Sequence, residues 1–282
     1  MFRMANLNFM EKAEKLICQY SGCVGFSIQS LDGKEKYEYQ QDHLFSSASV
    51  VKIFVLGCFL KMVEEGKRSL NAMLSLKEQD KVDGSGILLD MSEGMMLCTK
   101  DVAMLMIILS DNTATNMLID YVGGVERVTE HLKTVGIVCS RVNRKISDDP
   151  ESVAQSNFGD ASPEELMIYL YKMEKGQILS PKGKTIFFDM LSRQHYKNLF
   201  TRYMPITDYY DTYEPDQVKV FNKTGFMDGI RTDAGKLEMG SGKTYIYSVM
   251  TNQCADITYS PDREADLFPA LLGKIFYECV SE

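Results

Sequence analysis

Apolar and charged side chains recur at helical spacing over residues 9–19, which predicts an N-terminal helix. Two short apolar runs then flank the turn dipeptide Asp32-Gly33, and they predict a β-hairpin with strands over 24–29 and 36–40. Residues 49–65 are apolar on nearly every side. This run predicts a helix buried in the middle of a domain.

The middle of the chain, residues 68–200, carries helical signals separated by short loops, and we expect no clear strand in it. Thr99 is placed to cap a helix over residues 100–109. The segment Ser162-Pro163-Glu164-Glu165 is typical of a capping box with proline at the first helical position. The middle region is therefore predicted to be a helical insert.

After Pro205 the pattern returns to strands and ends in a helix over about 262–279. The expected strands cover residues 218–222, 232–238 and 245–251. This order predicts an α+β fold, in which one antiparallel sheet is flanked by helices and interrupted by a helical insert. We expect residues 1–66 and 205–282 to form an α/β sheet lobe and residues 67–204 an all-helical lobe, with the active site in the cleft between them.

Composition and charge narrow the classes of function. The 282 residues are 45% hydrophobic and 25% charged, as in an ordinary globular protein, which excludes disorder, collagen and coiled coil. The chain has 31 Lys and Arg against 39 Asp and Glu, a net charge of −8, so the basic face that nucleic acids require is not expected.

No apolar stretch approaches the roughly 18 residues that a membrane-spanning helix needs, so we expect no membrane partner. The first 15 residues contain no apolar core of a signal peptide, which predicts a cytoplasmic protein and leaves a trimmed secreted form open. The expected partner is a small-molecule or peptide-like substrate, and the chain is expected to be a monomer.

Metal and histidine chemistry are both disfavoured. The seven cysteines show no C-x-x-C spacing, so neither a zinc site nor a disulfide framework is indicated, and no cofactor is expected. The three histidines, His43, His131 and His195, lie in no setting typical of a Ser-His-Asp triad. Solvated or locally hydrogen-bonded imidazoles are the better interpretation.

A serine and a lysine open the apolar helix, in the segment Ser49-Val50-Val51-Lys52. Residues three apart share a helix face, so the Lys52 amine is predicted to lie beside the Ser49 hydroxyl. Burial lowers the pKa of a lysine, which lets Lys52 accept a proton from serine near neutral pH. The alternative is a helix cap followed by a lysine that extends to solvent.

Two further segments strengthen the first. Ser110-Asp111-Asn112 follows an apolar helix, and Lys223-Thr224-Gly225 ends a predicted strand. Each alone is compatible with an ordinary turn. Three such segments in this order, in these structural contexts, indicate a serine acyltransfer site.

On these residues the chain resembles the class A β-lactamase and penicillin-binding serine hydrolase superfamily, from about residue 24 to the C-terminal helix. The stretches that resemble the core of that superfamily also include residues 110–116, Gly123-Gly124 and residues 223–229. The resemblance implies a β-lactamase and transpeptidase-like fold, and a serine hydrolase that acts through an acyl-enzyme on an amide or ester with a carboxylate.

Carried over to this sequence, the resemblance makes Ser49 the nucleophile and Lys52 its proton acceptor or relay. It makes Ser110 the proton shuttle to the leaving group, and Asn112 a hydrogen-bond partner of the substrate's amide side chain. Lys223 would then supply positive charge near Ser110 and the substrate carboxylate.

The same resemblance places Thr224 and Gly225 at the substrate, with the Thr224 hydroxyl on its carboxylate. The backbone N–H groups of Ser49 and Phe226 would form the oxyanion hole. Arg231 could add a second contact to the carboxylate, because a guanidinium pairs with carboxylates in a bidentate manner, or could be a surface arginine.

One element of the class A pattern is missing. Those enzymes carry a loop glutamate that activates the water for deacylation, and alignment through residues 141–144 puts Ile146 at that position. Asp148, Asp149 or Glu151 could substitute if the loop is shifted, although such a run is typical of a solvated turn. Because general base assistance contributes on the order of 10²–10⁴-fold, its loss predicts slow deacylation of β-lactams.

The sequence leaves three functions open. The first is a serine hydrolase with poor β-lactam turnover, acting on a β-lactam-like or D-alanyl-D-alanine-like substrate. The second is a true class A β-lactamase in which Asp148, Asp149 or Glu151 is the base. The third is a binding or sensing module that is acylated once, or only binds a ligand, without turnover.

Overall fold

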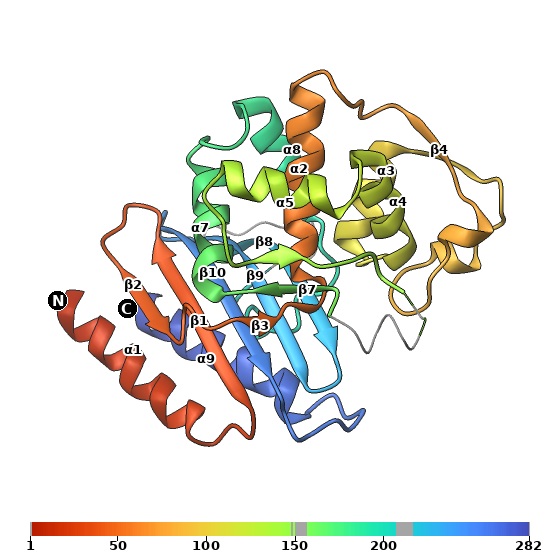
Figure 1. Cartoon of the computed structure of the whole chain (residues 1–282). Coiled ribbons are helices and arrows are strands. Elements are labelled where there is room, and N and C mark those ends of the chain that lie inside the picture. Colours follow the sequence, from red (N-terminus) through yellow and green to blue (C-terminus); the bar gives the residue numbers. More distant parts are fainter. Residues whose placement is uncertain (1, 148, 150–156, 207–216, 282) are drawn as a thin grey trace.

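The computed structural model describes residues 2–147, 149, 157–206 and 217–281. Its centre is a five-stranded sheet with the strand order β2-β1-β10-β9-β8, in which every neighbouring pair is antiparallel (Figure 1). The strands are β1 (Cys23–Ser30), β2 (Lys36–Tyr39), β8 (Lys219–Met227), β9 (Ile230–Glu238) and β10 (Thr244–Asn252). The pairing of β1 with β10 joins the two ends of the chain in one sheet, as the sequence predicted.

The two terminal helices cover one face of this sheet (Figure 1). They are α1 (Phe2–Ile17) and α9 (Glu264–Ser281), and they contact each other. The core on this side is rich in aromatic rings: Phe9 of α1 and Phe276 of α9 meet edge to face, with ring centroids 5.8 Å apart. Apolar side chains from all five strands of the sheet complete this core.

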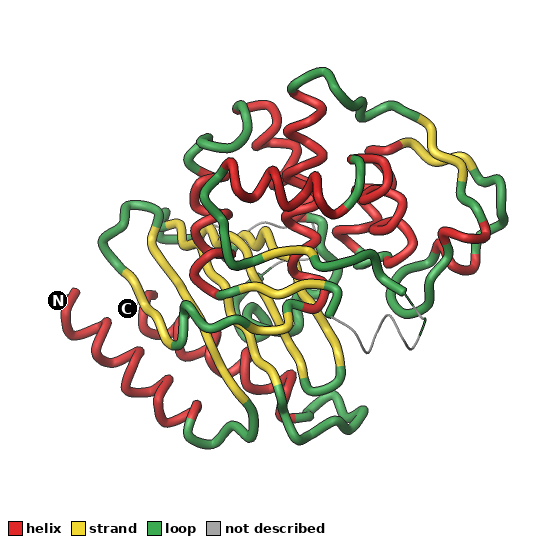
Figure 2. The backbone as a smooth tube through the Cα atoms, viewed as in Figure 1, coloured by secondary structure: helices red, strands yellow, loops and turns green. Residues whose placement is uncertain are grey.

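The remaining helices gather on the other face of the sheet and beyond it (Figure 2). The helix α7 (Pro163–Glu174) contacts β1, β9 and β10, whereas α8 (Pro181–Ser192) contacts β8. Farther out lie α2 (Lys52–Glu64), α3 (Thr99–Ile108), α4 (Asn112–Val122) and α5 (Val125–Thr134).

A single apolar cluster joins these helices to the sheet residues Ala234, Ile246 and Met250. The buried apolar residues therefore form two cores, one on each face of the sheet. The helix α2 belongs to the same core as the helical insert, although the sequence assigned it to the sheet lobe. The boundaries 1–66, 67–204 and 205–282 stay a prediction.

Several local expectations need correction. The region 68–200 contains the short strands β4 (Met73–Ser75), β5 (Met96–Cys98), β6 (Arg141–Val142) and β7 (Gly159–Ala161), which are too short to show a period of two. The strand β3 (Phe45–Ser46) pairs with β7. Further short 3-10 turns are η2 (Glu78–Asp80) and η3 (Leu88–Asp90).

Two helix starts also differ from the sequence analysis. Cys98, not Thr99, is the N-cap of α3, and the Thr99 hydroxyl donates to the Ser69 carbonyl instead. Ser162 does cap α7 by accepting from the Glu165 N–H. The Glu165 carboxylate, however, accepts backbone N–H groups of residues 138–140, so the reciprocal half of a capping box is not formed.

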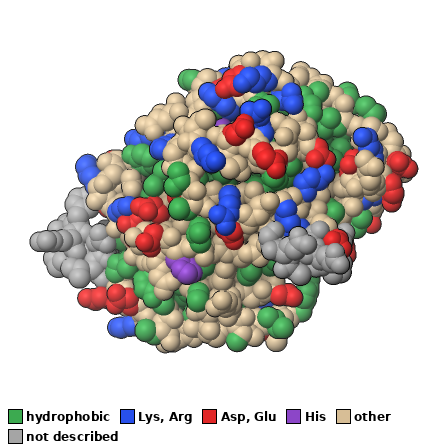
Figure 3. Space-filling view, in the orientation of Figure 1, with side chains coloured by type: hydrophobic (Ala, Val, Ile, Leu, Met, Phe, Trp, Pro, Cys, Tyr) green, Lys and Arg blue, Asp and Glu red, His purple; other side chains and the backbone are tan. Residues whose placement is uncertain are grey.

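The surface drawn in Figure 3 carries Lys and Arg side chains between Asp and Glu side chains. Over the described ranges, no helix has the length and apolar character needed to cross a bilayer. The same ranges hold no group of three or more His, Cys, Asp or Glu side chains placed to bind a metal ion.

Candidate active site

Ser49 lies in the 3-10 turn η1 (Ala48–Val51), which leads directly into α2. Two contacts hold the start of this turn: the Thr232 hydroxyl donates to the Ser47 carbonyl at 3.0 Å, and the Ser47 N–H donates to Gly159 at 3.0 Å. Ala48 has a φ of 46°, a left-handed conformation that residues other than glycine rarely adopt. Such strain persists only where surrounding contacts impose it, and it clusters at functional sites.

Lys52, the first residue of α2, is fully buried. Its Nζ donates to the Ser110 carbonyl at 2.8 Å, to Ser110 Oγ at 3.2 Å and to Asn112 Oδ1 at 2.9 Å. Among the described residues no hydrogen bond joins Lys52 Nζ to Ser49 Oγ, although the Lys52 N–H donates to the Ser49 carbonyl. Catalytic hydrogen bonds are often long in the free enzyme and shorten when substrate binds, so Lys52 remains a candidate base.

Ser110 lies between two lysines. Its hydroxyl oxygen accepts from Lys52 Nζ and, at 3.0 Å, from Lys223 Nζ. A hydroxyl has two lone pairs and one proton, so two N–H donors occupy both lone pairs and leave the proton to donate elsewhere. The residue has a φ of 56°, a second strained conformation at this site.

Burial governs the charge of both amines. It holds the pKa of Lys52 well below its ordinary value, together with the nearby positive charge of Lys223 and against the opposing charge of Asp111. Burial also lowers the pKa of Lys223 to about 7, and the carboxylate of Asp233 opposes this shift. Two buried amines that share one hydroxyl do not both hold a full charge easily, which favours a neutral amine on Lys52 at neutral pH.

The sequence analysis did not single out Asp111, which organises this side of the site. Its Oδ1 accepts from the Ala114 N–H and caps α4, while its Oδ2 accepts from the N–H groups of Ile87 and Leu88 at 2.7 and 2.9 Å. A Cβ at Gly86 would lie 2.3 Å from the Asp111 carboxylate, so only glycine fits at this position. The signal available in the sequence was its position directly before a helix.

The Asn112 amide is engaged at both ends in this structure. Its Oδ1 accepts from Lys52, and its Nδ2 donates to the Asp83 carbonyl at 2.9 Å. A substrate amide would have to replace one of these contacts. The predicted role of Asn112 in substrate binding therefore stays a prediction, while its place beside Lys52 is established.

Gly225 brings β8 against the nucleophile turn. A Cβ at this position would lie 2.7 Å from the Ser49 nitrogen and 2.4 Å from the Thr232 hydroxyl. Because real Cβ atoms do not approach backbone so closely, only glycine lets the strand pass here. Thr224, one residue earlier, has a buried hydroxyl without a hydrogen-bond partner among the described residues.

Phe226 follows Gly225 in β8 and is partly exposed. Its ring meets that of Tyr196 at 5.9 Å between centroids and lies 5.2 Å from the Arg231 guanidinium. The register of β8 with β9 pairs Phe226 with Arg231. The direction of the Phe226 N–H toward an oxyanion stays a prediction.

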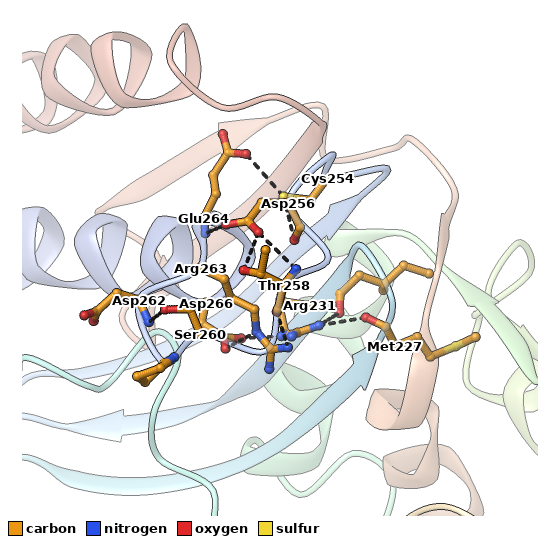
Figure 4. Close-up of polar contacts among 12 residues, drawn as sticks. Met227, Arg231, Cys254, Asp256, Thr258, Ser260, Asp262, Arg263, Glu264 and Asp266 are labelled. Carbon is orange, nitrogen blue, oxygen red and sulfur yellow. Dashed lines mark hydrogen bonds and ion pairs between the residues drawn. The ribbon is translucent and has the colours of Figure 1, made fainter.

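Arg231 was expected either to contact the substrate carboxylate or to lie on the surface, and its surroundings differ from both expectations. It is buried, and its Nε pairs with the Asp266 carboxylate of α9, so it is not a surface arginine (Figure 4). Its NH1 donates to the carbonyls of Met227 and Ile230 at 2.7 and 2.6 Å. Because these contacts hold the guanidinium in the β8–β9 turn, we leave Arg231 out of the candidate carboxylate site.

Ile146 and Lys52 are each bound by an asparagine of α4. Asn112 and Asn116 are four residues apart and share one face of this helix, the first bound to Lys52 and the second to Ile146. Asn116 Nδ2 donates to the Ile146 carbonyl at 2.8 Å, and the Ile146 N–H donates to Asn116 Oδ1 at 2.9 Å. The isoleucine side chain packs on the apolar core.

The three acids that could replace a loop glutamate follow Ile146. Asp149 is exposed, and its N–H donates to the Ser147 hydroxyl at 3.1 Å. Asp148 and Glu151 lie outside the described residues.

The histidines take no part in the described site. His131 is buried in the helical core, and its Nε2 lies 2.9 Å from the Tyr169 hydroxyl. His43 and His195 are exposed. A hollow of about 580 Å³ lies elsewhere, at the β1–β2 and β9–β10 turns, where its lining includes Lys34, Glu35 and Lys243. Its lining contains none of the predicted site residues, so the candidate site is assigned from the contacts of Ser49, Lys52, Ser110 and Lys223 and not from this hollow.

Comparison with known proteins decides the family. A model described as "Beta-lactamase enzyme family" matches residues 8–280, nearly the whole chain. The chain belongs to this β-lactamase enzyme family. It is a serine hydrolase of the β-lactamase-like superfamily, as its sequence segments indicated.

Individual relatives agree with the family assignment. The chain is 26% identical over 251 residues to β-lactamase ROB-1 of Haemophilus influenzae, covering 87% of this chain and 77% of that one. A β-lactamase from Sphaerobacter thermophilus has a similar structure, with a TM-score of 0.84 and 25% identity over 98% of this chain and 97% of that chain.

A mutant of PBP-A, solved as an acyl-enzyme complex with penicillin G, shares the fold, with a TM-score of 0.81 and 23% identity. The match covers 98% of this chain and 97% of that chain. The predicted fold is therefore confirmed by the structures of a β-lactamase and of PBP-A.

Proposed function

We propose that this protein forms an acyl-enzyme on Ser49 with an amide or ester substrate that bears a carboxylate, and that it deacylates β-lactams slowly. The observation that carries the proposal is the position of Ser110 Oγ between the nitrogens of Lys52 and Lys223, beside the turn that holds Ser49. A serine hydrolase of this superfamily needs such a proton path between nucleophile and leaving group.

Acylation follows from the charges of the two lysines. Lys52, with its lowered pKa, accepts the Ser49 proton as the hydroxyl attacks the carbonyl carbon. Ser110 accepts from both lysines, so its own proton is available for the leaving nitrogen or oxygen. The proton lost by Lys52 to Ser110 restores the hydroxyl, and the charge stays balanced.

Substrate binding uses the end of β8. Lys223, in its charged form, attracts the substrate carboxylate, and the Thr224 hydroxyl, which has no other described partner, is available to it. The N–H groups of Ser49 and Phe226 hold the oxyanion. β-Lactams are small substrates that fit the family, and D-alanyl-D-alanine-like peptides offer the same carboxylate.

Deacylation is the weak step. The position held by Asn116, one helical turn after the asparagine that binds Lys52, carries Ile146, whose side chain cannot accept a proton from water. A β-lactam keeps its leaving amine tethered to the acyl group, so its acyl-enzyme depends most on a dedicated base. Smaller acyl groups, whose leaving group departs, leave space for water near Lys52 and Ser110.

The test is acylation followed by turnover. The full chain is exposed to penicillin G and examined by intact-mass spectrometry, and a chromogenic cephalosporin is followed in parallel. We expect a persistent adduct of one penicillin per chain and a burst near one equivalent. Ser49→Ala should remove both, whereas Ser46→Ala, a serine three positions earlier, should retain both.

Each other outcome has a defined meaning. No adduct on the unmodified chain, or an adduct that survives Ser49→Ala, overturns the proposal. Many turnovers of the cephalosporin that disappear in a variant of Asp148, Asp149 or Glu151 establish a class A mechanism instead. A persistent adduct without hydrolysis of any ester or peptide substrate favours a sensing module. The monomeric state and the cytoplasmic location stay predictions.

A further inference from the structure

Asp233 lies behind the strand that carries Lys223. In the register of β8 with β9, Asp233 pairs directly with Thr224, the residue after Lys223. Paired residues point to the same face of a sheet and successive residues to opposite faces. Lys223 therefore faces Ser110 from one side of β8, and Asp233 lies on the reverse side of the same strand pair.

Lys223 is a buried amine without an ion pair. Its Nζ donates to Ser110 Oγ and to the Thr224 carbonyl, which are both neutral acceptors. No salt bridge to Lys223 is present in the described part of the chain, and Lys52 brings a second amine to the same hydroxyl. A buried cation in this position needs a negative charge from beyond its contacts.

The Asp233 carboxyl group accepts hydrogen bonds from three donors. Its Oδ1 accepts from Asn222 Nδ2 at 2.9 Å and from the Tyr247 hydroxyl at 3.0 Å, and its Oδ2 accepts from the Phe200 N–H at 3.1 Å. Only 1% of the side chain is exposed. Donors of this kind favour the charged form of a carboxylate, and they come from three separate segments of the chain.

The titratable groups around the two residues act in opposite directions. On the site face, the charge of Lys223 lowers the pKa of Lys52 of α2, whereas Asp111 of the α3–α4 turn raises the pKa of Lys52. On the reverse face, Tyr247 of β10 donates to Asp233. Burial raises the pKa of Asp233 to about 7 against its three hydrogen bonds and the charge of Lys223.

We propose that Asp233 is a positioning residue, whose carboxylate acts through β8 to keep Lys223 a cation able to bind the substrate carboxylate. Lys223 touches the substrate, and Asp233 does not. The inference rests on the proposed function for its consequence in catalysis, while the electrostatic coupling itself belongs to the folded chain. It also explains why a carboxylate is buried behind a strand where an apolar residue would pack at lower cost.

The first test measures the coupling without any substrate. Lysines labelled with ¹³C at Cε are titrated by NMR in the full chain, and the Lys223 signal is assigned by its loss in Lys223→Met. Asp233→Asn keeps the shape and an acceptor oxygen but removes the charge, so the pKa of Lys223 should fall by about one unit, a tenfold change in its protonation equilibrium. An unchanged Lys223 titration overturns the inference.

The matched control is Tyr247→Phe. This change removes one hydrogen bond to Asp233 from the same network and leaves the negative charge in place. A merely structural role of the network predicts the same Lys223 titration shift in both variants, and that result would also overturn the inference. An electrostatic role predicts a clear shift in Asp233→Asn alone.

The second test connects the coupling to catalysis. Acylation rates with a fluorescent penicillin, which has a carboxylate, are compared with those of p-nitrophenyl acetate, which has none, at pH 5–9 after subtraction of Ser49→Ala. For Asp233→Asn, the pH at which the acylation rate with penicillin declines on the alkaline side should be about one pH unit lower, which is about a tenfold loss of rate in that pH range. The pH dependence of acylation by the acetate should not change. An equal shift for both substrates refutes the link to carboxylate binding, whereas absence of acylation in the unmodified chain refutes the proposed function instead.

Discussion

The first two turns of α4 contact two neighbouring regions that differ in chemistry. Asn112 binds Lys52, which belongs to a polar group around the Ser110 hydroxyl. Asn116, one turn later, binds the backbone of Ile146, whose side chain joins the apolar core. An asparagine of α4 forms hydrogen bonds at both positions, so the regions differ mainly in the side chain that is held: the Lys52 amine in one and the apolar Ile146 in the other.

This comparison separates two steps of one reaction. The polar region contains a strained turn at Ser49, a buried amine of lowered pKa and a hydroxyl with an available proton, to which the proposed function assigns acylation. The proposed function assigns slow deacylation to the apolar region, because Ile146 there has no group that accepts a proton. A variant in either region tests this assignment when acylation and deacylation are both measured.

The largest expected effect comes from the polar region. Lys52→Met removes the candidate base from α2 and should slow acylation by penicillin on the order of 10³–10⁴-fold, within the range of general base catalysis. The sign of the pH dependence follows from the lowered pKa of Lys52: as pH falls, the amine is protonated and cannot accept the serine proton. The acid decline of the acylation rate should therefore lie well below pH 10.5, the ordinary pKa of lysine.

The control for this variant is on the same helix. Lys61→Met removes a lysine of α2 that has no contact with Ser110 among the described residues, and it should leave the acylation rate within about twofold. Acylation in Lys52→Met at more than a tenth of the normal rate would show that another group takes the Ser49 proton.

The sequence predicted the polar region better than the apolar one. The spacing of Ser49 and Lys52, and the segments at Ser110 and Lys223, indicated which residues gather, because short motifs encode local geometry. The strand period likewise predicted β8, β9 and β10. Lys52 nevertheless donates to Ser110 and not to Ser49, since the side-chain direction depends on groups 58 residues away.

The residues that the sequence analysis missed depend on contacts between distant segments. Asp233 receives donors from Asn222, Tyr247 and Phe200, and no local pattern links those positions. Asn116 and the Ile146 backbone are joined by two hydrogen bonds, which we call the clamp, and these residues are 30 positions apart in the sequence. The pairing of Arg231 with Asp266 was not predicted, because Asp266 lies on the last helix, 35 residues later.

An intermediate effect is expected from supplying the missing base. Ile146→Glu should raise the turnover of a chromogenic cephalosporin by about 10–10²-fold, because it supplies a carboxylate that can activate water, one helical turn from the asparagine that binds Lys52. Burial against the apolar core raises the pKa of such a glutamate, so the gain should increase with pH over the acid range as the carboxylate ionises. Acylation should change by less than about threefold, since it uses the polar region.

The matched variant is Ile146→Gln, which has the same shape as the glutamate and no base. It should acylate normally and retain the slow turnover of the unmodified chain. Equal turnover in the glutamine and glutamate variants would mean that the gain comes from space or water access. If neither variant increases cephalosporin turnover, the deacylating water lies away from residue 146. The assignment of slow deacylation to the apolar region would then be wrong.

The smallest effect should come from loosening the clamp itself. Asn116→Ala removes both hydrogen bonds to the Ile146 backbone, at a cost of about 1–3 kcal/mol in the free energy of unfolding for the unpaired groups. In the Ile146→Glu background it should reduce the gained turnover by about threefold to tenfold, because the glutamate is no longer held in place. The acylation rate should change by less than about twofold, since Asn112 still binds Lys52. Stopped-flow acylation and steady-state turnover on the same sample separate the two steps, and an equal loss in both would show that α4 couples the regions it adjoins.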